Sequence, residues 1–361
     1  MRKRPDKSSE VHQEKSHFKV QERQSSRSKR GTRVLVQMVV TIGILYLCIP
    51  VAQRLFPGFL SHPMFSYVAP FYTDLSRPAD FSLNHTVNLY LSPQEGIRLG
   101  IWHTVPETLW QEAQGKDLGW YEQTLQNGAP IFIYLHGNGG TRCCTESGAT
   151  HRIGVVNLLS AAGFHVFSLD YRGFGDSSGE PTEAGLTTDA LYLYQWVRAR
   201  SGSSLIIFWG HSLGTGVAAN TAVRLQEQGT TIDGVMLEGA FSKIPPGQEG
   251  AHHPFAWFYW RFPYFEYLFL DPMSKNKVVF PSGENVRKMK SPLLILHAED
   301  DHLVPLFMGQ ELFEIARNSR NSDEDVKLVP FERSLGYLHN GIYRDPRLPD
   351  IIKQFVSSLK N

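Results

Sequence analysis

The chain has 361 residues, an apolar fraction of 42% and a net charge of +1, which suit one large folded domain with appendages. Its three cysteines, Cys48, Cys143 and Cys144, exclude a disulfide framework. Neighbouring cysteines rarely form a bridge, so we assign the last two no role. The sequence has no metal-ligand spacing, phosphate-binding loop or dinucleotide fingerprint, so we expect no metal and no cofactor.

The N-terminal segment combines a basic tail with an apolar run. Residues 1–33 hold eleven Lys and Arg against four Asp and Glu, and their composition predicts a disordered tail. Residues 34–52 carry no charge and as a helix would be about 28 Å long, which matches a bilayer. A membrane anchor explains the basic tail better than a nucleic-acid partner does. It also explains the apolar run better than a buried core helix or a cleaved signal peptide does.

The charge before the apolar run predicts the orientation of the anchor. Excess Lys and Arg on the N-terminal side place that side in the cytosol, and everything after the anchor in a lumenal or extracellular space. The sequon Asn84-His85-Thr86 then predicts N-glycosylation at Asn84. Residues 53–84, rich in Phe, Pro and Tyr, form a linker close to the membrane.

Residues 85–361 have the pattern of one α/β domain. Alternation predicts an antiparallel pair of strands near its start, whereas residues 106–129 are polar and irregular. Short apolar strands then alternate with helices, which predicts a mostly parallel sheet covered on both faces. The expected strands are 85–91, 97–105, 131–135, 165–170, 204–209, 234–238, 292–297 and 326–330, and the expected helices 153–162, 187–200, 215–225, 307–316 and 348–359.

A Gly-x-Ser-x-Gly motif at residues 210–214 lies between an expected strand and an expected helix. This is the context of a nucleophile elbow, a sharp turn that presents its serine at the end of the sheet. Gly210 and Gly214 leave room for the turn, because a Cβ at either position would clash with the adjoining strand or helix. Ser212 is therefore the predicted nucleophile, and the helix that follows favours an anionic intermediate.

A serine nucleophile needs a base and a carboxylate that orients the base, in the chain order Ser, Asp, His. The segment Glu299-Asp300-Asp301 follows a late strand, and the D-x-x-V-P spacing selects Asp301, with Asp300 as the runner-up. His339 lies beyond the last strand and is the predicted base. Other histidines are expected to have different roles. His136 and His211 shape the loops of their motifs, and His302 adjoins the acid. A surface or rim position is expected for His151, His252 and His253.

The oxyanion hole should consist of two backbone N–H groups. One belongs to Leu213, directly after the nucleophile. The other lies in the loop His136-Gly-Asn-Gly-Gly140 after the strand at 131–135, at Asn138 or alternatively at Gly139. Glycines there allow the backbone to turn its amides towards a substrate.

Several segments together resemble a known family. They are HGNGGTR (136–142), LDYRGFGDS (169–177), WGHSLGTGVA (209–218), LLILHAEDD (293–301) and LGYLHN (335–340), with LNHTVNLYL (83–91) and IWHTVP (101–106) upstream. They are similar to the membrane-anchored α/β-hydrolases typified by abhydrolase domain-containing protein 12.

This resemblance implies an α/β-hydrolase fold with the triad Ser212, Asp301 and His339. It further implies a lipase of lysophosphatidylserine and monoacylglycerols, which is anchored in the endoplasmic reticulum membrane with a lumenal active site. The sequence departs from the family at 238–241, where a Ser-Pro is expected before the Phe, and at Cys143-Cys144. Neither departure touches the triad.

An insertion at about 242–290, before the acid, is the expected cap. Its residues 253–270 include ten aromatics, which form either the core of the cap or a surface that passes acyl chains from the membrane to Ser212. In the second case, replacing Trp257 and Trp260 with Ala weakens lipid hydrolysis but spares a short soluble ester. The alternative functions are a protein depalmitoylase or other thioesterase, a peptidase, and an inactive membrane-anchored scaffold that binds lipids.

Overall fold

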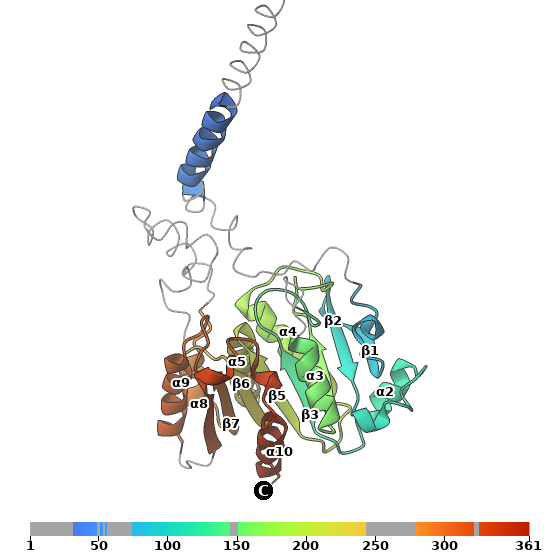
Figure 1. The fold of residues 1–361 in the computed structure, drawn as a ribbon. Helices are drawn as coiled ribbons and strands as arrows, with labels where there is room; N and C mark the ends of the chain where they lie inside the picture. The colour runs from blue at the N-terminus through green and yellow to red at the C-terminus, as the bar shows by residue number, and fades with distance from the viewer. Residues whose placement is uncertain are drawn as a thin grey trace, which may run out of the picture.

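The computed structural model describes residues 32–48, 51, 52, 55, 74–144, 151–242, 279–320 and 325–360. Within these residues the fold is built on an eight-stranded sheet with the order β1-β2-β4-β3-β5-β6-β7-β8 (Figure 1). The strands are β1 (Thr86–Gln94), β2 (Ile97–Thr104), β3 (Ile131–Leu135), β4 (His165–Leu169), β5 (Ile206–His211), β6 (Gly234–Glu238), β7 (Leu293–Ala298) and β8 (Val326–Phe331).

The pairing of the strands confirms the predicted sheet. Strands β1 and β2 form an antiparallel pair, and β2 also pairs antiparallel with β4. From β4 through β3, β5, β6 and β7 to β8, every neighbouring pair is parallel. The sheet is therefore mostly parallel, and the antiparallel hairpin forms one edge.

Helices cover both faces of the sheet, which explains why the central strands are apolar throughout. In β3, Ile131, Ile133 and Leu135 pack into the core on one face, and Phe132 and Tyr134 into the core on the other. Helices α4 (Glu183–Arg198), α5 (Leu213–Glu227), α8 (Ser282–Lys288) and α9 (Leu306–Asn318) supply the first core, and α3 (His151–Ala161) and α10 (Leu348–Ser358) the second.

The segment 106–129, which was expected to be irregular, contains helix α2 (Leu118–Thr124). The carboxylate of Asp117 caps this helix by accepting a hydrogen bond from the N–H of Trp120 at 3.0 Å. Tyr121 is the one buried residue of α2, and it packs with Val105 and Ala113 in a small separate cluster. With one buried position in seven residues, the helix has almost no apolar periodicity, so the prediction was wrong here. The described chain also has 3₁₀ turns at Pro78–Phe81, Glu107–Leu109, Arg333–Leu335 and Ile342–Arg344.

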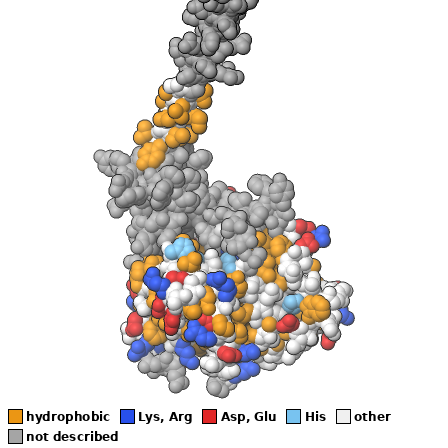
Figure 2. Space-filling view, viewed as in Figure 1, with side chains coloured by type: hydrophobic (Ala, Val, Ile, Leu, Met, Phe, Trp, Pro, Cys, Tyr) orange, Lys and Arg blue, Asp and Glu red, His pale blue; other side chains and the backbone are white. Residues whose placement is uncertain are grey.

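Before the domain, residues 32–48 form a helix whose apolar side chains are exposed (Figure 2). Among the described residues, no helix is both long and apolar enough to cross a membrane. The expected tail, most of the linker and the aromatic segment 253–270 of the cap lie outside the described residues.

Candidate active site

The loops with the predicted site residues meet at the carboxyl ends of the parallel strands. Because β3, β5, β7 and β8 are parallel, their carboxyl ends lie on the same side. Ser212 follows β5, Asp301 follows β7 and His339 follows β8. The chain runs from β3 outward to β4 and then returns to β5 on the other side, so the strand order reverses between β3 and β5. Such a reversal point is where open α/β sheets bind their ligands.

The turn at Ser212 has the strained backbone of a nucleophile elbow. Its φ of 51° and ψ of −117° lie in a region that L residues rarely adopt. The surrounding structure holds this conformation from both sides. The N–H of Ser212 donates to the carbonyl of Glu238 at 2.9 Å, and its carbonyl accepts from the N–H of Thr215 at 2.8 Å and from the hydroxyl of Thr215 at 2.6 Å.

The two glycines of the motif are required by close packing, as the sequence predicted. A Cβ on Gly214 would lie 1.9 Å from the carbonyl oxygen of Leu135 in β3. A Cβ on Gly210 would lie 2.3 Å from the carbonyl oxygen of Gly214. Helix α5 therefore crosses the sheet at a distance that admits hydrogen alone at these positions.

We expect Gly214→Ala to lower the free energy of unfolding by about 3 kcal/mol or more, because two backbone segments would have to separate. Urea denaturation measures the loss. Gly119→Ala in helix α2 is the matched control, since its new Cβ would meet nothing nearer than 3.5 Å, and we expect a change below about 1 kcal/mol. Equal losses in the two variants would contradict the packing argument.

The structure pairs His339 with Asp301. Nδ1 of His339 lies 2.7 Å from Oδ2 of Asp301, and both side chains are almost fully buried. Oδ1 of Asp301 accepts two further hydrogen bonds at 2.9 Å, from the N–H groups of Leu303 and Val304. Asp300, the runner-up, instead accepts from the N–H of Leu338 at 3.0 Å. The geometry therefore supports Asp301 as the carboxylate that orients the base.

Opposing effects act on the pKa of Asp301. Burial raises it, but the hydrogen bond and charge of His339 and the two backbone N–H groups outweigh burial, so the pKa lies below its usual value. The carboxylate is consequently ionised at neutral pH. It can fix the tautomer of His339 and stabilise the imidazolium that forms when this base accepts a proton.

Two other histidines pack beside the base. Nε2 of His211 lies 3.0 Å from the carbonyl oxygen of His339, and the ring of His151 lies 5.3 Å from that of His211. His151 was expected on a surface or rim, but it is 5% exposed, so that prediction was wrong. Burial, with a contribution from the charge of Arg152, lowers the pKa of His151 to about 3, and burial holds that of His211 well below its usual value. Both stay neutral, so they place no positive charge beside His339.

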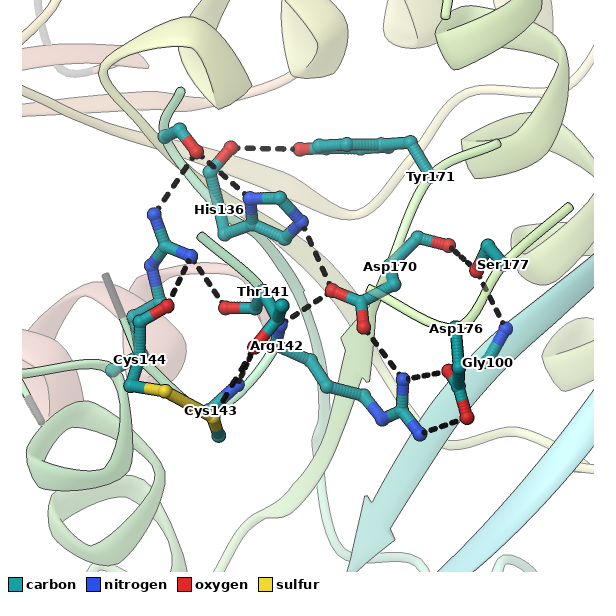
Figure 3. Close-up of polar contacts among 12 residues, drawn as sticks. Gly100, His136, Thr141, Arg142, Cys143, Cys144, Asp170, Tyr171, Asp176 and Ser177 are labelled. Atoms are coloured by element: carbon teal, nitrogen blue, oxygen red, sulfur yellow. Dashed lines mark hydrogen bonds and ion pairs between the residues drawn. A yellow bond between two sulfur atoms is a disulfide. The ribbon is translucent and has the colours of Figure 1, made fainter. Parts of the chain in front are cut away.

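The loop after β3 touches the elbow, as an oxyanion loop must. A Cβ on Gly137 would lie 3.1 Å from Cβ of Ser212. Gly139 and Gly140 have φ values of 78° and 88°, which favour glycine, so the tight turn explains the Gly-Gly pair. The hydroxyl of Tyr171 donates to the carbonyl of His136 at 3.0 Å and anchors the start of the loop (Figure 3). Leu213, the other predicted donor, opens α5.

A buried ion network ties the end of this loop to the next strand (Figure 3). Nη1 of Arg142 lies 2.5 Å from Asp170 and 2.6 Å from Asp176.

Directly after Arg142, the adjacent Cys143 and Cys144 form a disulfide, and both residues are buried. The sequence had made this pairing improbable. Among the described residues no cluster of His, Cys, Asp or Glu could hold a metal ion.

Glu238 belongs to the site, but nothing in the sequence indicated that the pKa of its side chain is shifted. It ends β6, its backbone carbonyl holds the N–H of Ser212, and its side chain is 3% exposed. Burial is the main cause that raises its pKa from 4.5 to about 7. The nearby Asp301 charge adds to the rise, whereas the indole N–H of Trp209, at 2.9 Å, opposes it. No motif marks this group, because its effect depends on what surrounds the end of the strand.

The raised pKa of Glu238 predicts how stability changes with pH. Between pH 4.5 and about 7 the folded protein retains a proton that the unfolded chain has released. The stability from this group is thus complete below pH 4.5 and is lost as pH rises through 7, by about 3 kcal/mol. Glu238→Gln removes the titration but retains an acceptor for Trp209. We expect urea denaturation at pH 5 and pH 8 to show a smaller decline for this variant than for the wild type. An equal decline would contradict the assignment.

The fold and the site together define an α/β hydrolase. A family model described as "alpha/beta hydrolase fold" matches residues 130–273. The esterase Pf2001 of Pyrococcus furiosus superposes with a TM-score of 0.56 at 19% identity, covering 81% of this chain and 95% of that one, which supports the fold alone.

Two curated relatives narrow the assignment. Lysophosphatidylserine lipase ABHD12 of Xenopus tropicalis is 44% identical over 330 residues, which cover 91% of this chain and 83% of that protein. Protein ABHD12B of Homo sapiens is 46% identical over 291 residues, which cover 81% and 78%. The chain belongs to the ABHD12 family of α/β hydrolases.

Proposed function

We propose that this chain is a serine hydrolase that releases fatty acid from lysophosphatidylserine and from monoacylglycerols. The observation that carries the proposal is the distance of 2.7 Å between Asp301 and His339, a pair that lies at the carboxyl ends of the strands, as the strained elbow at Ser212 does. A carboxylate, an oriented imidazole and an elbow serine are the parts that acyl transfer to serine requires.

The reaction follows from the roles of these three residues. Oγ of Ser212 bonds to the acyl carbonyl carbon while its proton moves to His339, and the carbonyl electrons become an oxyanion held by the N–H groups of Leu213 and Asn138. The intermediate collapses, the bond to the glycerol oxygen breaks and that oxygen takes the proton. Water then attacks the acyl-enzyme, His339 accepts its proton, and the fatty acid leaves as Ser212 regains a proton.

The choice of substrate rests on the relatives. The Xenopus tropicalis relative is named as a lysophosphatidylserine lipase, and the chain matches most of that protein. A soluble esterase fold accepts many esters, so the relatives and the proposed anchor are what favour a lipid.

A panel of substrates with one acyl chain tests this choice. Membranes that carry the protein are given lysophosphatidylserine, monoacylglycerol, lysophosphatidylcholine and a palmitoyl thioester peptide, and fatty acid release is measured. We expect the first two to be hydrolysed fastest. A faster rate on the thioester would favour the depalmitoylase instead. Absence of hydrolysis and of fluorophosphonate labelling would favour the scaffold.

We also propose that residues 34–52 anchor the protein in the endoplasmic reticulum membrane, with residues 1–33 cytosolic and the hydrolase domain lumenal. The exposed apolar side chains of the helix at 32–48 and the basic tail before it support this arrangement. Asn84 is exposed, so it is accessible for glycosylation in that compartment. A mobility shift that endoglycosidase removes, and that Asn84→Gln abolishes, is expected. An unshifted wild type would argue against the lumenal orientation.

A further inference from the structure

Arg152 is a buried arginine whose charge has no acidic partner among the described residues. It lies in the first turn of α3 and is 1% exposed. The other two fully or nearly buried arginines, Arg142 and Arg172, form ion pairs with aspartates. A buried charge without a carboxylate is costly unless hydrogen bonds satisfy it, so its retention calls for an explanation.

The guanidinium of Arg152 instead binds the backbone of the loop after β3. Nη2 donates to the carbonyl of Gly137 at 3.0 Å and to that of Gly139 at 2.7 Å. Nη1 donates to the carbonyl of Cys144 at 3.3 Å and to that of Thr141. One side chain thus gathers four carbonyls of the segment 137–144. The fixed fork of an arginine suits this task, whereas a lysine is a single point of attachment.

These contacts determine which way the amides of the loop point. In a planar trans peptide the C=O and the next N–H point in opposite directions. The carbonyl of Gly137 is held by Arg152 and also lies 2.8 Å from Nδ1 of His136, so the N–H of Asn138 is directed away from the guanidinium. A Cβ added to Gly137 would lie 3.1 Å from Cβ of Ser212, so Gly137 lies beside the elbow while Arg152 binds its carbonyl.

We infer that Arg152 is a positioning residue for the oxyanion hole, which fixes the peptide between Gly137 and Asn138 so that its N–H faces the oxyanion. Preorganised donors of this kind stabilise the transition state without reorganising during the reaction. The inference rests on the proposed acyl transfer to Ser212. It also selects Asn138 over Gly139 as the donor of this loop. Of the four carbonyls that Arg152 binds, that of Gly137 belongs to the peptide of the Asn138 N–H, and none belongs to the peptide of the Gly139 N–H.

The test compares Arg152→Met, Arg152→Lys and wild type in the full-length protein, with a short p-nitrophenyl ester as substrate. Methionine retains the length of the side chain but no donor. We expect its kcat to fall about 100-fold with KM within about threefold of wild type, as is typical when an oxyanion donor is lost. Lysine binds fewer carbonyls, and we expect a fall of about tenfold. The affinity for an alkyl trifluoromethyl ketone, whose adduct carries the oxyanion, should weaken in parallel with kcat/KM.

Val155→Ala is the matched control, because Val155 is buried on the same helix in the core beneath it. It should lower the unfolding temperature but leave kcat, at a temperature well below unfolding, within threefold of wild type. A wild-type kcat in Arg152→Lys, or an equal loss of kcat in Val155→Ala, would overturn the inference. If the methionine variant does not fold, the kcat of the lysine variant provides the test.

The wild type distinguishes this inference from the proposed function. A wild type that neither hydrolyses the ester nor reacts with a fluorophosphonate would overturn the proposed function as well. A wild type that hydrolyses the ester but not lysophosphatidylserine would refute only the proposed lipid substrate.

Discussion

Replacing Ser212 with alanine is expected to reduce hydrolysis of any ester by at least about 10⁴-fold. The variant loses the atom that forms the acyl-enzyme, and the oxyanion donors and the binding of substrate retain a small residual rate. The change itself is conservative for folding, since alanine can occupy the turn and the hydrogen bonds at Ser212 all involve its backbone, through the N–H and the carbonyl. Initial rates on a soluble p-nitrophenyl ester measure the effect without interference from a lipid surface.

Ser334→Ala provides the control for this experiment. Ser334 is an exposed serine in the loop that leads to His339, and we expect it to retain wild-type activity. A fluorophosphonate should label the wild type and Ser334→Ala, but not Ser212→Ala. Substantial activity in Ser212→Ala would mean that another group is the nucleophile.

Asp301→Asn is expected to lower kcat by about 10⁴-fold. Oδ1 of Asp301 accepts from two backbone N–H groups, so an asparagine would keep its oxygen there and turn its NH2 group towards Nδ1 of His339. That donor favours the wrong tautomer of His339, and the neutral amide stabilises the imidazolium less than the carboxylate does. The lowered pKa of Asp301 has a consequence for stability. Its contribution is complete above the usual pKa of 3.8 and is lost as pH falls through the lower folded value. The kinetic comparison at pH 7 is therefore made where the wild-type carboxylate is fully ionised.

Asp300→Asn separates the two neighbouring carboxylates. Asp300 bonds to the backbone of Leu338 and not to the base, so we expect a change in kcat of less than about tenfold. If Asp300→Asn lost as much activity as Asp301→Asn, the result would contradict the assignment of Asp301 as the carboxylate that orients His339.

The elements that sequence reasoning located are those with strong local signals. The strands that end before Ser212 and Asp301 are short apolar runs bounded by turns. The order of the three triad residues along the chain can be read from the sequence without knowledge of their tertiary contacts. The Gly-x-Ser-x-Gly spacing also predicted why Gly210 and Gly214 must be small, because the turn itself imposes that limit. Local chemistry was sufficient for these parts of the site.

Other features depend on partners that are distant in the sequence. Burial, with a smaller contribution from the charge of Asp301, raises the pKa of Glu238 to about 7. Asp301 lies 63 positions later in the chain, and no pattern in the strand of Glu238 indicates this effect. Arg152 follows His151 in a segment without a motif, and its role comes from carbonyls that the turn after β3 brings together. Helix α2 escaped prediction because it buries a single side chain. Such effects arise from tertiary packing, which a single sequence does not display.

The most direct test of the central claim is release of fatty acid from lysophosphatidylserine by membranes that carry the full-length chain or its Ser212→Ala variant at equal abundance. We expect rapid release with the wild type and a rate at background with the variant. Equal release from both, or no release from a wild type that is folded and labels with a fluorophosphonate, would contradict the claim.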